Sequence, residues 1–278
     1  MLHDMKKLEN YKISATDGEI GQVKDFYFDD DKWTVRYLIV ETGTWLSSRK
    51  VLISPISLQD PDWQAHTLAV SITMAQLESS PDIDTDKPVS RQNEEQYLNY
   101  YGYPAYWGGA GIWGEGLYPY ASVPGYAGHP VDRVAREQEL EAYLAQERAR
   151  HRNDDPHLRS CNELIGYHIH ATDGEIGHVA GFVVDDQTWA IRYLIVDTSN
   201  WWLGKKVLVA PHWITAMDWA EQTVTVDLSR EFIKNAPVYD ADAELTRDQE
   251  LSLYRHYGRR GYWADGTVLD TGVNKKAG

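Results

Sequence analysis

The heptapeptide ATDGEIG at residues 15–21 decides the fold, because it returns unchanged at residues 171–177. The offset of 156 residues (15 to 171) continues without a gap on both sides of the heptapeptide. It also relates the run RYLIV at 36–40 to the same run at 192–196. A long internal repeat indicates duplicated structural units. We therefore predict two copies of one module, each near the usual domain size of about 100 residues.

Alternating apolar segments flank the heptapeptide in each copy, as expected for strands on both sides of a turn. An Asp-Gly pair favours a hairpin turn, because Gly adopts positive φ at little cost. The next alternating run, at 33–40 and again at 189–196, predicts a long strand. The residues predicted to form the turns are Asp17, Gly18, Asp173 and Gly174.

One arginine lies inside this apolar strand in each copy, Arg36 and Arg192. An unpaired charge among apolar neighbours is costly. We therefore expect each guanidinium to have a carboxylate or carbonyl partner, with Glu19 and Glu175 of the repeated turn as candidates.

Five or six short strands with frequent turn signals predict a mainly β fold of two tandem small antiparallel β-barrels, over 11–72 and 167–228. Short helices are expected after each barrel. In the second copy Ser229 precedes a predicted helix over 230–235, and Thr246 with Gln249 fits a capping box for another.

A Gly/Tyr/Pro-rich linker over 108–130 and a charged helix over 131–150 join the two barrels. The linker aromatics, unusual for a bare spacer, are Trp113, Tyr118, Tyr120 and Tyr126. The sequence does not decide whether residues 108–130 are ordered. The predicted organisation is 1–107 for the first barrel with its helical aromatic extension, 108–156 for linker and helix, 157–263 for the second barrel with its extension, and 264–278 for a polar tail.

The composition narrows the class of function. A formal net charge of −15 argues against nucleic acid and anionic lipid as partners. The start of the chain lacks an apolar signal region, and no run of about eighteen apolar residues occurs, so no membrane insertion is expected. A single cysteine, Cys161, fits a reducing compartment, and we predict a cytoplasmic protein with this thiol buried.

Three histidines of the second copy, His168, His170 and His178, lie at and beyond one predicted strand and could form a zinc site. The first copy has Lys12, Ser14 and Gln22 in their place, so the fold does not require a metal. Surface histidines are the preferred interpretation. We predict no metal, no cofactor and no catalytic residue.

Bulky indoles occur where a polar loop is expected, at Trp45 in the first copy and at Trp201 and Trp202 in the second. Two hypotheses stay open. Each Trp plugs the end of its own barrel, or the loops form a patch for a partner, since Trp is frequent at interface hot spots.

The sequence resembles the PRC-barrel family. The resemblance rests on GYHIHATDGEIGHV at 166–179, WAIRYLIVDT at 189–198 and WLGKKVLV at 202–209, with counterparts in the first copy. It implies the β-barrel fold and a docking role, as in the cytoplasmic part of the photosynthetic reaction centre H subunit. We therefore expect a non-catalytic scaffold for protein partners or for a homo-oligomer. The alternatives are a ligand- or metal-binding regulator using the cleft between barrels, or an accessory role in photosynthetic electron transport.

Overall fold

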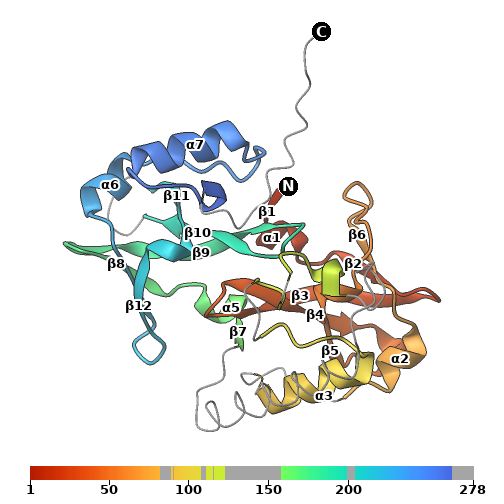
Figure 1. Ribbon diagram of the computed structural model, residues 1–278. Helices are drawn as coiled ribbons and strands as arrows, with labels where there is room; N and C mark the ends of the chain where they lie inside the picture. Colours follow the sequence, from red (N-terminus) through yellow and green to blue (C-terminus); the bar gives the residue numbers. More distant parts are fainter. Residues whose placement is uncertain are drawn as a thin grey trace.

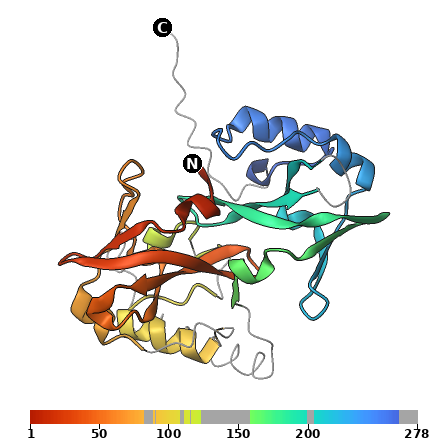
Figure 2. The ribbon, with the colours of Figure 1, turned by 180° about the vertical axis from the view of Figure 1, so that it is seen from behind.

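The computed structural model describes residues 1–81, 89, 91–107, 111–114, 116–122, 158–198 and 204–264. The fold of these residues is mainly β, with two sheets and a few short helices (Figure 1), which confirms the predicted class. Helices α6 and α7 cover the outer side of one sheet, and α2 and α3 lie on the opposite side of the molecule, as the view from behind also shows (Figure 2).

Each copy builds its own sheet and the helices that follow it. The first module comprises β2 (Lys12–Ser14), β3 (Glu19–Asp29), β4 (Thr34–Thr42), β5 (Lys50–Ile53), β6 (Thr67–Ala69), α2 (Met74–Glu78) and α3 (Arg91–Tyr101). The second module comprises β8 (His168–Ala171), β9 (Gly174–Asp185), β10 (Ile191–Asp197), β11 (Lys206–Val209), β12 (Ile214–Asp218), β13 (Thr223–Val226), α6 (Arg230–Asn235) and α7 (Arg247–His256).

The strand order is β5-β4-β3-β2-β6 in the first sheet and β11-β10-β9-β8-β13-β12 in the second. Neighbours are antiparallel except for β2 with β6 and β8 with β13, which are parallel. In each parallel pair the two strands are far apart in sequence, so a long connection and not a hairpin sets their relative direction. Among the described residues, the first and last strands of neither sheet pair with each other, so neither sheet closes into a barrel. The closed, all-antiparallel barrels of the prediction are therefore not observed, and closure stays a prediction.

A short segment precedes each module: β1 (Leu2–Asp4) with α1 (Met5–Leu8), and β7 (Leu158–Ser160) with α5 (Cys161–Leu164). We call residues 2–8 arm 1 and residues 158–164 arm 2. Each arm pairs with the sheet of the other module: β1 lies antiparallel to β9, and β7 antiparallel to β3. The registers are equivalent, with Leu2 opposite Asp185 and Leu158 opposite Asp29. The two modules therefore exchange arms.

The two modules also bond to each other where β4 and β10 begin. The backbone N–H of Val35 donates to Trp189 O at 2.8 Å, and that of Ile191 donates to Trp33 O at 2.7 Å. Both tryptophans have positive φ, 49° and 58°, so the same tight turn is used twice. The interface therefore has approximate twofold symmetry.

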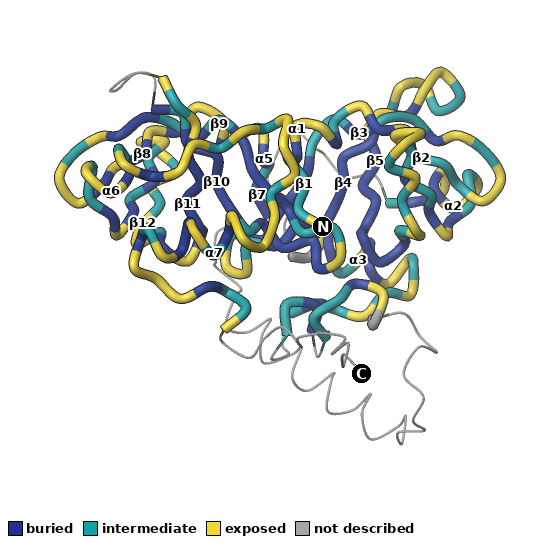
Figure 3. The backbone as a smooth tube through the Cα atoms, turned by 90° about the horizontal axis from the view of Figure 1, so that it is seen from above, coloured by how far each residue is buried: buried dark blue, intermediate teal, exposed yellow. Residues whose placement is uncertain are grey.

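The arms lie between the sheets, and the buried residues follow the strands of both modules (Figure 3). One hydrophobic cluster extends through both, from Ile13 and Val40 to Ile169 and Val196. The two modules are therefore joined by exchanged arms and by a shared hydrophobic core.

The predicted helix starts in the second module are confirmed. Ser229 caps α6 by accepting from the backbone of Phe232. Thr246 and Gln249 form a capping box at the start of α7. No helix among the described residues is long and apolar enough to cross a membrane.

Candidate functional site

The repeated heptapeptide joins the β2–β3 turn to the helix at the end of the module. Asp17 Oδ1 accepts from the backbone N–H of Met74, the first residue of α2, at 2.8 Å. Asp173 accepts in the same way from Arg230, the first residue of α6, at 2.7 Å. Gly18 lies in the turn beside Asp17, and Gly174, at the end of the second turn, has a φ of +135°. The duplicated acid therefore satisfies a free helix donor, and its role is structural.

The prediction that Arg36 and Arg192 have carboxylate partners is confirmed, but the named partners were wrong. Arg36 pairs with Asp29 at 3.1 Å, and Arg192 with Asp185 at 3.0 Å. Each aspartate ends the preceding strand, so the hairpin brings it beside the arginine.

The glutamates of the repeated turn lie at the other end of the same long strands and pair elsewhere. Glu19 contacts Lys12 at 3.3 Å, and Glu175 contacts His168 at 2.8 Å.

Aromatic rings cover both guanidinium groups. The guanidinium carbon of Arg36 lies 3.8 Å from the ring centre of Tyr106, and that of Arg192 lies 4.1 Å from the ring centre of Tyr262. Residues of the linker add to the cover on Arg36, because the carbonyl oxygen of Ile112 accepts a hydrogen bond from it and Trp113 lies 4.8 Å away. Arg36 is consequently 1% exposed, whereas Arg192 is 14% exposed.

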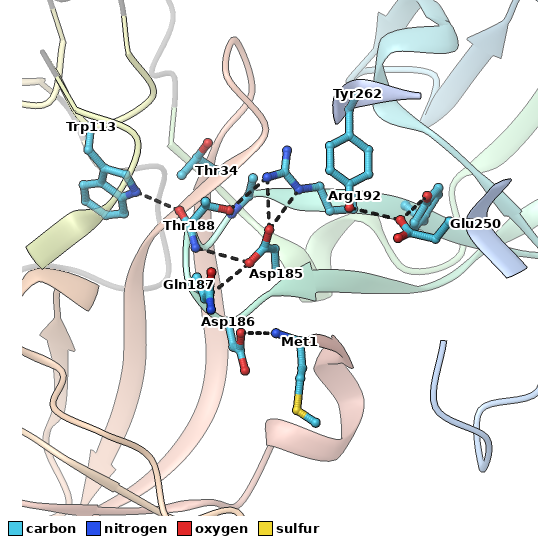
Figure 4. A network of polar contacts seen from close by, with 12 residues as sticks. Met1, Thr34, Trp113, Asp185, Asp186, Gln187, Thr188, Arg192, Glu250 and Tyr262 are labelled. Carbon is cyan, nitrogen blue, oxygen red and sulfur yellow. Dashed lines mark hydrogen bonds and ion pairs between the residues drawn. The ribbon is translucent and has the colours of Figure 1, made fainter. Parts of the chain in front are cut away.

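A buried glutamate completes the cluster in each module. Glu250 Oε1 accepts from Tyr193 at 2.6 Å and from Tyr262 at 3.0 Å, as Figure 4 shows for Tyr262. Burial raises the pKa of Glu250, and burial raises the pKa of Tyr262 to about 12. In the first module, Glu94 accepts from the equivalent tyrosines, Tyr37 and Tyr106.

The second cluster borders an open groove of about 660 Å³. Its walls are the start of arm 1, the β9–β10 turn, helix α7 and the segment after it (Figure 4 shows several of these residues). Its lining includes Asp185, Arg247, Glu250, Tyr262 and Trp263. Tyr118 of the linker also lines it. Arg247 pairs with Glu250 at 2.9 Å and lies over Trp263 at 4.3 Å. The groove therefore offers aromatic and charged side chains held by a paired network.

Replacing Glu250 by Gln should change the pH dependence of stability. Because burial makes its pKa higher in the folded than in the unfolded chain, the folded protein binds this proton first as the pH falls. As the pH falls from neutral to the pKa of Glu in the unfolded chain, about 4.3, the wild type should therefore gain stability relative to Glu250→Gln. Thermal melts of both proteins from pH 7 to pH 4.5 test this. Glu244→Gln, exposed in the same groove, is the control, and parallel curves for wild type and Glu250→Gln would contradict the prediction.

Trp45 lies in a short 3-10 helix (Thr44–Leu46) and is half-buried against the core of its own module. Its indole N–H donates to the carbonyl oxygen of Ile20 at 2.7 Å. These contacts favour the plug hypothesis for this residue. Trp201 and Trp202 lie outside the described residues.

The structure places His168 and His170 on the exposed face of β8, with His178 opposite His168 on β9. His168 is paired with Glu175. In the described part of the chain, no three His, Cys, Asp or Glu side chains come together as a metal site. The predicted burial of Cys161 is confirmed, and burial raises the pKa of its thiol.

The linker aromatics behave differently from one another. Trp113 is buried in the shared core, and its indole N–H donates to the carbonyl oxygen of Thr188 in the second module at 2.8 Å. Tyr118 and Tyr120 stack on each other with ring centres 5.1 Å apart. Tyr126 and the predicted charged helix over 131–150 lie outside the described residues.

Sequence reasoning missed both arms and the buried glutamates. A signal for the glutamates was present, because the 156-residue offset relates Glu94 to Glu250 and each is followed three positions later by Tyr97 or Leu253 on the buried side of its helix. The arms gave no comparable signal, since a three-residue strand has no readable periodicity.

Residues 4–63 match the PRC-barrel domain family. No curated protein matches the chain. The family match begins in arm 1 and extends over β2 to β5 of the first module. The family match therefore supports the resemblance to PRC-barrel domains over residues 4–63.

Proposed function

We propose that this protein is a non-catalytic, cytoplasmic scaffold of two PRC-barrel modules that binds a protein partner in the groove beside α7. The observation that supports this is the groove itself, which gathers Tyr118, Tyr262, Trp263 and Arg247 on one surface. Tyr, Trp and Arg are the residue types that most often dominate protein-binding energy. The fixed network beneath them reduces the entropy lost when a partner binds.

A binding role suits the buried glutamate better than a catalytic one. Both oxygens of Glu250 are engaged, one by Tyr193 and Tyr262 and the other by Arg247. A fully satisfied buried network rigidifies its surroundings. We therefore assign Glu250 to support of the groove wall.

Two neighbouring residues of α7 provide a matched test. Leu251 is half-buried and lines the groove, whereas Ser252 is exposed and lines a separate, smaller cavity of about 140 Å³. Leu251→Arg should weaken partner binding at least tenfold, while Ser252→Arg leaves it unchanged, because only the arginine at 251 would place a bulky, unpaired charge inside the contact surface. Affinity capture with the full chain, followed by titration of the captured protein, measures this.

Thermal melts must show that both variants are folded. Sedimentation of the wild type identifies a homo-oligomer if the partner is a second copy. The proposal is wrong if the wild type retains no protein and does not self-associate, or if Leu251→Arg binds as the wild type does.

The second candidate is a ligand-binding regulator that uses a cavity between the modules. A cavity of about 230 Å³ lies between α1 and α5 and is lined by Met5, Phe26, Cys161 and Phe182 among others. It is smaller than the usual range of about 300–1,000 Å³ for ligand sites. Native mass spectrometry with metal analysis distinguishes the two candidates, because only this one requires a bound small molecule or metal.

A further inference from the structure

The exchange of arms poses a problem of specificity. The two sheets are copies of each other, and β1 and β7 use equivalent registers on them. Several arm contacts are also of the same kind in both places. His3 contacts Asp186 at 2.9 Å, and Arg159 contacts the equivalent Asp30 at 3.5 Å. Because such contacts are available on both sheets, they give neither arm a preference for one sheet over the other.

Among the positions that break the symmetry, four place an arm residue against a sheet residue. The cap residue of α1 in arm 1 is Asp4, whereas the cap residue of α5 in arm 2 is Ser160. The strand position facing arm 2 is Asp25 on β3, whereas its counterpart facing arm 1 is Gly181 on β9. At these four positions, each arm–sheet contact therefore contains one carboxylate, supplied by the sheet in one case and by the arm in the other.

At arm 2, the carboxylate of Asp25 binds the arm directly. Ser160 Oγ donates to Asp25 Oδ2 at 2.5 Å, and the backbone N–H of Asn162 donates to Asp25 Oδ1 at 3.1 Å. At arm 1, the carboxylate of Asp4 occupies the corresponding place. A Cβ atom added at Gly181 would lie 4.0 Å from Asp4 Oδ1.

The alternative pairing, in which each arm binds its own module, would break both arrangements. Asp4 would face Asp25, and two carboxylates in one partly buried site repel each other. Ser160 would face Gly181, and the hydrogen bonds that Asp25 accepts from arm 2 would be lost. The exchanged pairing avoids both penalties at once.

We propose that positions 4, 25, 160 and 181 form a charge code that directs each arm to the sheet of the opposite module. The code defines the partner that each arm recognises. Arm 1 requires a PRC-barrel sheet with no side chain at the position of Gly181, and arm 2 requires a sheet with an acid at the position of Asp25. It excludes pairing of arm 1 with the first module of a second copy of this chain. This inference does not depend on the groove or on its occupant.

The test uses the full chain and compares charged with neutral isosteres. Gly181→Asp should melt about 5 °C or more below Gly181→Asn at pH 7, because the added charge faces Asp4 and the added volume is matched. Asp4→Ser in the Gly181→Asp background should recover most of that difference.

A mirrored set guards against misfolding at Gly181, where a new Cβ would lie 3.2 Å from Ile195. Ser160→Asp should melt below Ser160→Asn, and Asp25→Asn should remove the difference. The code is overturned if the Asp and Asn variants melt together at both positions, or if removing Asp4 and Asp25 leaves the differences unchanged.

Discussion

Replacing Arg36 by Met should lower the free energy of unfolding by about 3–5 kcal/mol, because it leaves the carboxylate of Asp29 buried without its ion-pair partner. Both groups are almost fully buried, at 1% and 7% exposure. Methionine keeps most of the packing volume beneath Tyr106, so the loss of stability should come from the missing positive charge and not from a cavity. Urea unfolding followed by tryptophan fluorescence measures the change.

The second module provides the control for this prediction. Arg192 and Asp185 are 14% and 18% exposed, so water replaces part of the lost interaction. Arg192→Met should therefore cost clearly less than Arg36→Met. Adding Asp29→Asn to Arg36→Met should restore part of the stability, because the amide oxygen can still accept from the backbone N–H groups of residues 31 and 32. Equal losses at Arg36 and Arg192 would contradict the argument.

Replacing Gly21 or Gly177 by Ala should lower the free energy of unfolding by roughly 2–3 kcal/mol or more, through overpacking and backbone strain. A Cβ atom at Gly21 would lie 2.0 Å from the carbonyl oxygen of Glu41, and one at Gly177 would lie 2.0 Å from that of Asp197. Both obstacles are backbone atoms of the neighbouring strand, so neither can move without breaking the sheet. Gly177 also has a φ of +140°, and its substitution should cost more.

Gly258 is the matched control, because it has a φ of +62° and nothing within 4 Å of an added Cβ. Gly258→Ala should cost about 1–2 kcal/mol from backbone conformation alone. Denaturant melts of the three variants separate the effect of the close approach from the effect of φ. If Gly21→Ala is no more destabilising than Gly258→Ala, the close approach of the neighbouring strand to Gly21 does not add to the cost of the substitution, and the prediction is wrong.

Local chemistry explains why much of the fold was predictable. The strand containing Arg36 follows from alternation, and the start of α7 follows from Thr246 and Gln249, which lie within one helical turn. These signals depend on residues a few positions apart, which the sequence displays directly. The requirement for a buried counter-charge was also predictable, since it follows from desolvation alone.

The identity of that counter-charge was less accessible. Choosing Asp29 over Glu19 as partner requires the register of β3 on β4, and β-bulges shift this register between Val23 and Asp25 and between Tyr27 and Phe28. Irregularities of this kind leave no clear trace in an alternating pattern. The burial of Trp113 against the second module likewise depends on a contact made 75 residues away along the chain.

By itself, the sequence determined that the chain is a duplicated, mainly β protein with structural Asp-Gly turns and a PRC-barrel resemblance. Only the tertiary structure decided which sheet each arm joins. The reason is the duplication itself: two nearly identical sheets offer each arm the same hydrogen-bonding edge and the same apolar pattern. The choice therefore depends on single side chains such as Asp25 and on the glycine at 181, whose effect appears only when the strands are side by side.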